Sequence, residues 1–235
     1  MKATLLWPRD WRSQPRQAHG DYKSTLRRSQ SQALVSLPPG TGEHAGPTFG
    51  PHDVLAAHAD LTRNASAGGE AIGERIIVAG RVLEEDGRPL RDALVEVWQA
   101  NAAGRYTHER DQHDAPLDPN FLGAGHVLTD SEGRYRFTTI RPGAYPWRNH
   151  ANAWRPAHIH FSVFGRAFAQ RLVTQMYFPG DPLLPLDPIF NATASKAARR
   201  RLVAEFSQRL SEPEWALGYT FDIVLRGSAA TPMED

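Results

Sequence analysis

The 235-residue sequence predicts a mainly β protein, a β-sandwich with long loops and one peripheral helix. Three observations predict this class. Short segments in which apolar and polar residues alternate recur along the chain, separated by turn residues. The 19 glycines and 18 prolines favour many short turns over long helices. A single segment, KAARRRLVAEFSQRL (196–210), carries apolar residues at the spacing of four that indicates a helix.

The strand predictions follow from period-2 alternation. RIIVAGRVL begins at Arg75 and leads to a hairpin turn predicted at Asp86-Gly87, after which a second strand begins at Leu94. A second unit of the same kind has its turn at residues 131–133. The other segments predicted as strands are HVLTD (126–130), RYRFTTI (134–140), AHIHFSVFG (157–165), RLVTQMYF (171–178) and GYTFDIVLRG (218–227).

Three segments are predicted to be irregular. Residues 101–125 form a polar loop of a length that is more often functional than idle. GDPLLPLDPI (180–189) is expected to lack regular structure because of its three prolines. Residues 1–50 form an N-terminal arm with a basic run, and residues 51–235 form the β-sandwich domain. Two interpretations of the arm stay open: a solvated extension, or a segment that packs on a partner or helps to hold an anionic ligand.

Composition excludes several classes of protein. The net charge of +1 gives no reason to expect nucleic acid or a membrane as a partner. The apolar run in MKATLLWPRDW is too short for a secretory leader, and we expect a cytoplasmic protein. Cysteine is absent, which removes disulfides, thiolate zinc sites and iron–sulfur clusters. Any metal must therefore be held by His, carboxylate or Tyr.

His158 and His160 are the leading candidate site residues. In a strand, alternate side chains share a face, so both imidazoles point one way while Ile159 and Phe161 point the other. This pairing suits a metal ion, although a structural pair with satisfied nitrogens stays open. The acid that would complete a cupin site or a two-His-one-carboxylate site is missing near the pair.

The nearby oxygen donors of unusual type are tyrosines. Tyr145 follows a Pro-Gly turn and precedes a proline, which holds it extended, and Tyr106 lies in the long loop. Each could equally be a packing residue that buries its ring. A centre of two phenolates and two imidazoles would require a hard, strongly Lewis-acidic cation, because the pKa of a phenol is about 10. Such a set favours Fe(III) over Zn(II) or Fe(II).

A family resemblance emerges from these residues. TDSEGRYRFTTIRPGAYPWRNHANAWRPAHIHF (129–161) closely resembles the core of the intradiol ring-cleavage dioxygenases, which are non-haem Fe(III) enzymes. The N-terminal segment RDWRSQPRQAHGDYKSTLRRSQ (9–30) resembles the β subunit of a two-subunit member of that family. Further matching segments are GPTFG (46–50), GRVLEEDGRPLRDALVEVWQANAAGRY (80–106), APLDPNF (115–121), LVTQMYFPGDPL (172–183) and YTFDIVLRG (219–227).

The resemblance implies one Fe(III) per chain and no haem, flavin or nicotinamide. Its implied metal ligands are Tyr106, Tyr145, His158 and His160. In the family, the tyrosine that matches Tyr145 leaves the iron when the catechol chelates, and then accepts a proton. The implied fold is an intradiol dioxygenase-like sandwich with a transthyretin-like core.

The resemblance also implies roles around the metal. Arg155 would stabilise the anionic ring electrostatically, and Gln175 would be a polar residue near the substrate and oxygen pocket. For Arg155, the alternative is a surface arginine that pairs with a carboxylate. Tyr22, Trp147 and Ile189 match substrate-binding positions, for which core packing is a comparable explanation.

The function that the resemblance implies is intradiol cleavage of protocatechuate, a small aromatic dihydroxy acid, by O2, giving 3-carboxy-cis,cis-muconate. It also implies a hetero-oligomer with a homologous α subunit, in which the arm (1–50) makes subunit contacts and lies at the pocket edge of the catalytic domain (51–235). The alternatives are a non-catalytic transthyretin-like binding module and a dioxygenase of another catechol. Two further alternatives are a family α subunit and a single-chain member of the family. An α subunit would lack the iron ligands, and a single-chain member would carry a helical N-terminal region that this sequence does not show.

Overall fold

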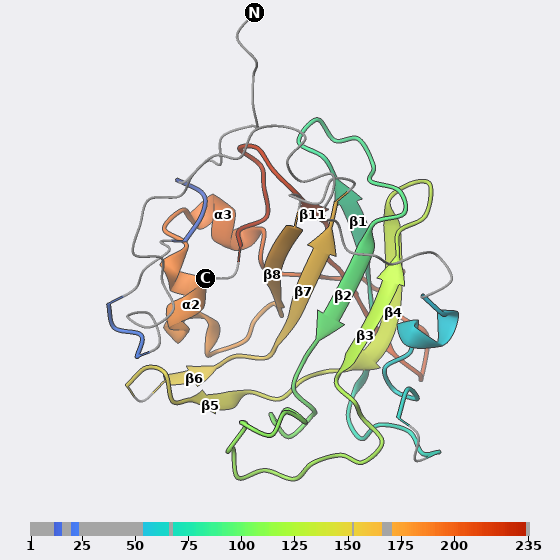
Figure 1. Ribbon diagram of the computed structural model, residues 1–235, viewed down its shortest axis with the longest axis vertical. Helices are drawn as coiled ribbons and strands as arrows, with labels where there is room; N and C mark the ends of the chain where they lie inside the picture. Colours follow the sequence, from blue (N-terminus) through green and yellow to red (C-terminus); the bar gives the residue numbers. More distant parts are fainter. Residues whose placement is uncertain are drawn as a thin grey trace, which may run out of the picture.

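Two β-sheets pack face to face around the hydrophobic core (Figure 1). The computed structural model describes residues 12–15, 20–23, 54–65, 68–151, 153–165 and 171–233. The first sheet contains β1 (Arg75–Leu83), β4 (Arg134–Ile140), β9 (Glu205–Phe206), β10 (Leu217–Thr220) and β11 (Ile223–Val224). The second has the order β3-β2-β7-β8, with β3 Ala124–Leu128, β2 Leu94–Trp98, β7 His158–Phe164 and β8 Arg171–Tyr177. The predicted β-sandwich is confirmed.

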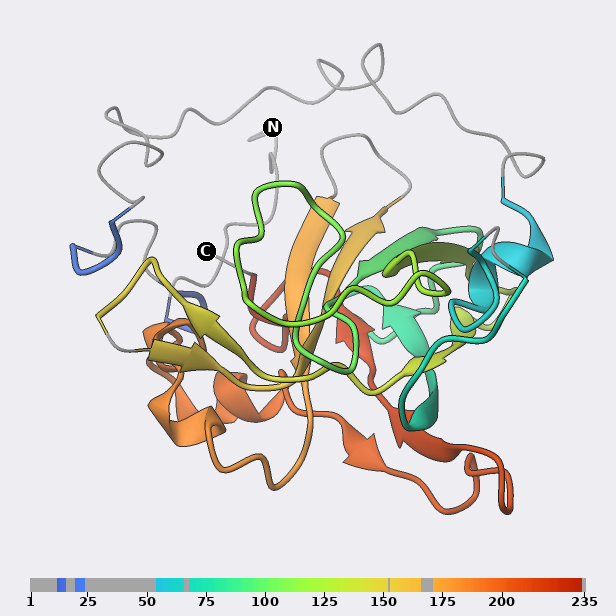
Figure 2. The ribbon, with the colours of Figure 1, turned by 90° about the horizontal axis from the view of Figure 1, so that it is seen from below.

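In the part of the chain that the structure describes, a small third sheet and four short helices lie around this sandwich. The strands β5 (Tyr145–Trp147) and β6 (Ala153–Arg155) form an antiparallel pair that lies below the main sheets in Figure 1. The helices are η2 (Ala56–Ala59), η3 (Leu184–Leu186), α2 (Pro188–Ala192) and α3 (Lys196–Arg200). Figure 2 shows α2 and α3 on the same side of the molecule as the β5–β6 pair. Every helix among the described residues is too short or too polar to span a bilayer.

Strand β7 supplies the centre of the core. The side chains of Ile159, Phe161 and Val163 alternate along one face of β7 and are fully buried. The Phe161 ring lies 5.9 Å from the ring of Phe137 in β4 of the opposite sheet and 5.3 Å from that of Phe221, which lies between β10 and β11. Because the inner face of β7 is filled by apolar side chains, its other residues must point away from the core.

The two predicted turns form, but each connects strands of different sheets. Gly87 and Gly133 adopt φ values of +79° and +70°, which only glycine accepts without strain. After the first turn the chain pairs briefly with β1, through a 2.8 Å hydrogen bond from Leu90 N to Val82 O, and then crosses to the second sheet as β2. The second turn returns the chain from β3 to β4 in the first sheet. The predicted strand at Leu94 is therefore correct, whereas its expected hairpin partner is wrong.

The predicted helix over 196–210 is wrong beyond its first turn. Helix α3 ends at Arg200, because the backbone that follows it forms hydrogen bonds with β8 instead of continuing the helix. Tyr177 N donates to Leu202 O, and Ala204 N donates to Tyr177 O, both at 2.8 Å. Phe206 then belongs to β9 and is 49% exposed, so the apolar spacing of four did not mark a buried helical face.

Two other predictions need correction. The segment 180–189 was expected to be irregular, yet it contains η3 and begins α2. Proline is tolerated in the first turn of a helix, and Pro188 occupies that position after the N-cap residue Asp187. The single strand predicted over 218–227 is divided into β10 and β11. Most of the predicted arm lies outside the described residues.

The break between β10 and β11 depends on a close backbone approach. Phe221 N donates to Ala79 O at 2.9 Å, and the Phe221 carbonyl oxygen accepts a hydrogen bond from the Tyr135 hydroxyl. A Cβ atom on Gly80 would collide with that carbonyl oxygen. Gly80 is therefore required for the two sheet segments to meet.

We expect Gly80→Ala to lower the free energy of unfolding by about 1–3 kcal/mol, because the added methyl group must displace backbone atoms. Urea denaturation monitored by tryptophan fluorescence measures the change. Gly20→Ala is the control, since a Cβ atom at Gly20 would meet no atom of the described residues within 4 Å. Equal stability of the two variants would contradict the proposed steric requirement.

Candidate metal centre

The outer face of β7 carries two buried histidines. His158 and His160 are 2% and 7% exposed, and their ring centroids lie 4.8 Å apart. The strand register places Trp98 of β2 and Gln175 of β8 on either side of His160. The indole of Trp98 stacks on the His160 imidazole with a centroid separation of 4.8 Å and an interplanar angle of 4°. Both histidines therefore share one face of the sheet, as the sequence predicts.

The tautomer of His158 follows from its backbone contact. Its Nδ1 lies 2.7 Å from the carbonyl oxygen of Pro156, which can only accept a hydrogen bond, so Nδ1 carries the proton. The Nε2 lone pair is then directed at the Tyr145 hydroxyl, 3.3 Å away. Burial lowers the pKa of His158 well below its usual value, and the nearby charges of Arg155 and His160 lower it further. The ring is thus held neutral, the form that binds metals.

The two tyrosines approach the histidines from different segments. Tyr145 begins β5, directly opposite Arg155 in β6. The Tyr106 hydroxyl lies 3.1 Å from Nε2 of His160, and the rings of the two tyrosines meet edge to face at 5.4 Å. The four predicted ligand positions are therefore brought together in space.

A close contact between two loops aligns the tyrosines. Gly143 N donates to Asn101 O at 2.9 Å, which ties the turn before Tyr145 to the loop that carries Tyr106. A Cβ atom on Gly104 would collide with the carbonyl oxygen of Ala144. Gly104 also has a φ of +78°, a conformation that glycine adopts without strain.

Asn101 shapes the loop itself. Its side-chain Oδ1 accepts hydrogen bonds from the backbone N–H groups of Ala103 and Arg105, both at 3.0 Å, and its Nδ2 donates to Pro116 O. Tyr106 N donates to Asp111 Oδ2 at 2.8 Å, which holds the next part of the loop. The predicted polar loop is thus ordered by side-chain contacts to its own backbone.

The donor set fits a hard metal ion. Among the described residues, no group of three or more His, Asp or Glu could hold a metal, and the donors that lie beside the two histidines are phenol oxygens. Two ligands that are each about 2 Å from one ion lie roughly 3 Å apart when they bind at right angles. The Tyr106–His160 and Tyr145–His158 separations of 3.1 and 3.3 Å match that spacing. The chemistry of two phenols and two imidazoles suits Fe(III).

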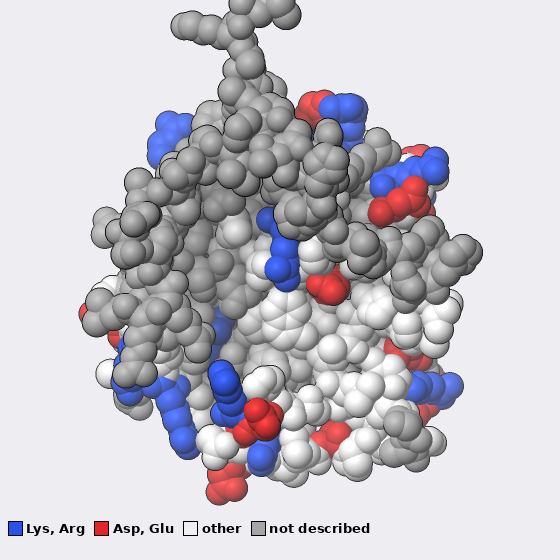
Figure 3. Space-filling model, viewed as in Figure 1, with Lys and Arg blue, Asp and Glu red and all other residues white. Residues whose placement is uncertain are grey.

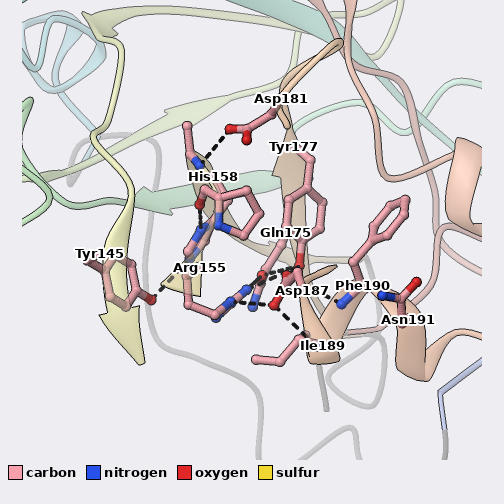
Figure 4. Close-up of polar contacts among 12 residues, drawn as sticks. Tyr145, Arg155, His158, Gln175, Tyr177, Asp181, Asp187, Ile189, Phe190 and Asn191 are labelled. Atoms are coloured by element: carbon pink, nitrogen blue, oxygen red, sulfur yellow. Dashed lines mark hydrogen bonds and ion pairs between the residues drawn. The ribbon is translucent and has the colours of Figure 1, made fainter. Parts of the chain in front are cut away.

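Arg155 lies beside this centre in a buried polar network (Figure 4). Its guanidinium Nη2 donates to Gln175 Oε1 and to the Tyr177 hydroxyl, and its Nε pairs with Asp187. Arg155 is therefore not the surface arginine that was considered as an alternative. Within the described part of the chain, Gln175 Nε2 is buried and has no hydrogen-bond acceptor. Because Gln175 Oε1 accepts from Arg155, the Nε2 end of the same side-chain amide points away from Arg155.

Tyr177 and Asp187 were not suggested by sequence reasoning. Tyr177 lies opposite His158 in the β7–β8 register, and Asp187 is the N-cap residue of α2. Burial raises the pKa of Tyr177 well above its usual value, so its hydroxyl keeps its proton. The two-residue spacing of Gln175 and Tyr177 could have indicated Tyr177, because it places both side chains on the face of the sheet that carries His158 and His160.

The predicted substrate-binding positions lie at one side of the network. The ring of Tyr22 meets that of Trp147 edge to face at 4.9 Å, and the Arg155 Cζ atom lies 5.8 Å from the Trp147 ring centroid. Lys23 N donates to Asn149 O at 3.0 Å, which holds this part of the arm against the β5–β6 connection. Ile189 belongs to α2, whose N-cap residue is Asp187, and it lies next to the Arg155–Asp187 pair in Figure 4.

Comparison with known proteins defines the class. Residues 44–227 match the family model described as "Dioxygenase", and residues 7–40 match the model for the protocatechuate 3,4-dioxygenase beta subunit N terminal. A solved 3-chlorocatechol 1,2-dioxygenase from Rhodococcus opacus 1CP superposes with a TM-score of 0.54 and 24% identity, over 76% of this chain and 69% of that one, and so shares the fold. The chain belongs to the intradiol dioxygenase family, whose members are non-haem iron enzymes.

Within that family, the chain is more similar to one beta chain than to one alpha chain of protocatechuate 3,4-dioxygenase. The chain is 61% identical to the protocatechuate 3,4-dioxygenase beta chain of Burkholderia cepacia, over 98% of both chains. It is 30% identical to the protocatechuate 3,4-dioxygenase alpha chain of Pseudomonas putida, over 85% of this chain and 97% of that one. The match therefore covers both the sandwich and the N-terminal segment.

We expect Gly104→Ala to reduce the iron bound per chain, because the added methyl group pushes the Tyr106 loop away from Tyr145. Metal analysis of the purified protein measures the loss. Gly87→Ala is the matched control: Gly87 also has a positive φ, of +79°, but a Cβ atom there meets no atom within 4 Å. Full iron content in Gly104→Ala would show that the loop contact does not position Tyr106.

The lowered pKa of His158 predicts a pH-dependent stability of the metal-free protein. The unfolded chain takes up a proton near pH 6.5, whereas folded His158 resists protonation, so stability falls as the pH drops below about 6.5. One such proton contributes a slope of at most about 1.4 kcal/mol per pH unit. Urea unfolding between pH 7 and pH 5 should show a shallower slope for His158→Gln. Identical slopes would argue against a buried neutral His158.

Proposed function

We propose that this chain catalyses the intradiol cleavage of protocatechuate by O2 at one bound Fe(III), giving 3-carboxy-cis,cis-muconate. The observation that carries the proposal is the pairing of each phenol oxygen with one imidazole nitrogen at 3.1–3.3 Å on a buried sheet face. The 61% identity to a protocatechuate 3,4-dioxygenase beta chain supports the choice of substrate.

The residues proposed to hold the metal are Tyr106, Tyr145, His158 and His160. When bound, Fe(III) would supply the Lewis-acid and redox chemistry that ring opening by O2 requires. Two phenolate ligands stabilise the ferric state, because they place negative charge on a hard cation. Tyr145 lies at the start of a short edge strand, and its phenol oxygen is proposed to take a proton from the entering substrate hydroxyl.

Arg155 and Gln175 are proposed to act on the reacting ring. A guanidinium beside the metal stabilises negative charge that develops on the substrate, and its effect is large because Arg155 is 2% exposed. The Gln175 amide nitrogen, which lacks an acceptor among the described residues, is suited to donate a hydrogen bond to a ligand oxygen.

Tyr22, Trp147 and Ile189 are proposed to line the substrate pocket. The contact of Tyr22 with Trp147 supports the view that the arm, residues 1–50, reaches the pocket edge of the catalytic domain, residues 51–235. Two aromatic rings and an aliphatic side chain suit a flat aromatic substrate, because they present apolar surface on several sides.

The assembly that we propose is a hetero-oligomer with a homologous α subunit. In register with the histidines, the outer face of the second sheet carries the apolar side chains of Leu94, Leu128 and Phe164 together with Glu96, His126 and Arg171. Figure 3 shows basic and acidic side chains near the middle of this face as well as at its edges. The likeness to both the beta and alpha chains supports this assembly.

We expect the chain, purified with its partner chain from iron-replete cells, to be reddish from phenolate-to-Fe(III) charge transfer. Anaerobic addition of protocatechuate should shift that absorption band, and admission of air should consume one O2 per ring opened, as measured with an oxygen electrode. Tyr145→Phe should alter the band and slow chelation, because one phenolate is lost.

Tyr219→Phe is the control for this experiment, since Tyr219 lies in the first sheet against Phe178 and away from the histidines. Its spectrum and its rate should match those of the wild type. A colourless, iron-free wild-type protein would refute the proposed function. An unchanged spectrum in Tyr145→Phe would refute only the ligand role of Tyr145.

A further inference from the structure

Asp187 forms a buried ion pair with the candidate catalytic residue Arg155. Arg155 Nε lies 3.0 Å from Asp187 Oδ1, and the two side chains are 2% and 0% exposed. Both groups lose their hydration on burial, so each is tolerated only because the other compensates its charge. The carboxylate thus attracts the Nε edge of the guanidinium by charge, although Nε makes no hydrogen bond of good geometry with it.

Tyr177 completes the support of that edge. Arg155 Nη2 donates to the Tyr177 hydroxyl at 3.1 Å, and this hydroxyl lies 2.9 Å from Asp187 Oδ2 and 2.7 Å from Gln175 Oε1. A hydroxyl has one hydrogen to donate, and a carboxylate is a stronger acceptor than an amide oxygen. The Tyr177 hydroxyl therefore donates to Asp187 while it accepts from Arg155, which closes a three-membered ring of contacts.

The same carboxylate also holds the segment that carries Ile189. Asp187 accepts hydrogen bonds from the backbone N–H groups of Ile189 and Phe190, at 3.3 and 3.4 Å, as the N-cap of α2. One buried group thus connects β6, β8 and α2, the elements that carry Arg155, Gln175 and Ile189 (Figure 4). A change at Asp187 must alter the relation between the guanidinium and the neighbouring pocket wall.

We propose that Asp187, together with Tyr177, is a positioning residue that sets the direction of the Arg155 guanidinium toward the ring being cleaved. This inference rests on the proposed function. Gln175 alone would leave the guanidinium free to swing, since a single amide oxygen does not define its plane. Asp187 attracts the Nε edge of the guanidinium as an ion pair at 3.0 Å without hydrogen-bond geometry, and the Tyr177 hydroxyl adds a second acceptor for Nη2 beside Gln175 Oε1.

The test is Asp187→Asn, measured on the full chain purified with its partner chain. Asparagine is as good an N-cap residue as aspartate, so α2 keeps its cap while Arg155 loses its counter-charge. We expect kcat per bound iron to fall by about 100-fold, the loss typical of a misplaced catalytic group, with KM changed much less. Tyr177→Phe keeps the ring and removes only the hydroxyl, and should lower kcat about tenfold.

A double-mutant cycle separates positioning from general damage. Arg155→Lys keeps a positive charge but lacks the planar fork that Asp187 and Tyr177 hold. In that background, Asp187→Asn should lower kcat far less than in the wild type. Ser195→Ala removes the matching N-cap of α3, where the Ser195 hydroxyl accepts from Ala198 N, and should leave kcat unchanged.

Each outcome decides the question. A wild-type kcat in Asp187→Asn, or an equal fold-loss in both Arg155 backgrounds, overturns the positioning role. Where Asp187→Asn yields no folded protein, Tyr177→Phe and its cycle with Arg155→Lys decide by the same criterion. A wild-type protein that binds iron but does not consume O2 with protocatechuate counts against the proposed function, whereas an active wild type with an unaffected Asp187→Asn counts against this inference alone.

Discussion

The two-residue period of β7 is the constraint on which the candidate site depends. The apolar side chains of Ile159, Phe161 and Val163 fill the core, so His158 and His160 must point outward. A slip of one residue would bury both imidazoles in the core and expose the three apolar side chains. Pairing with β2 on one side and β8 on the other prevents that slip, and it also delivers the partners of the histidines. Stability and site geometry therefore have the same origin.

The second determinant is the burial of charge beside the histidines. Arg155 and Asp187 are almost fully excluded from solvent, in a network with Tyr177 and Gln175. Such a pair adds little net stability, because desolvation offsets the attraction between the charges. The network instead orients the guanidinium of Arg155, so that a positive charge lies next to the proposed metal ligands. The network therefore contributes a preorganised electrostatic environment rather than net stability.

The third determinant is the close approach of two loops that are distant in sequence. The loop that carries Tyr106 meets the turn before Tyr145 at Gly104 and Gly143, where side chains would prevent contact. The long loop after β2 is therefore more than a connection. It brings a phenol to His160 from outside the segment that supplies the other three candidate ligands. The Asn101 side chain stabilises the loop, because it accepts hydrogen bonds from backbone N–H groups that would otherwise bond to water.

The sequence by itself determined the features that depend on local periodicity: the strands, the turns at Gly87 and Gly133, and the shared face of His158 and His160. The missing cysteines and acids point to Tyr145 and Tyr106 as candidate oxygen donors, whereas the ligand set and the roles of Arg155 and Gln175 come from the family resemblance. Only the tertiary structure decided which strands pair, where the helix at Lys196 ends, and that Tyr177 and Asp187 hold Arg155. These features depend on hydrogen bonds and burial between distant segments, and such contacts leave no periodic pattern in the chain.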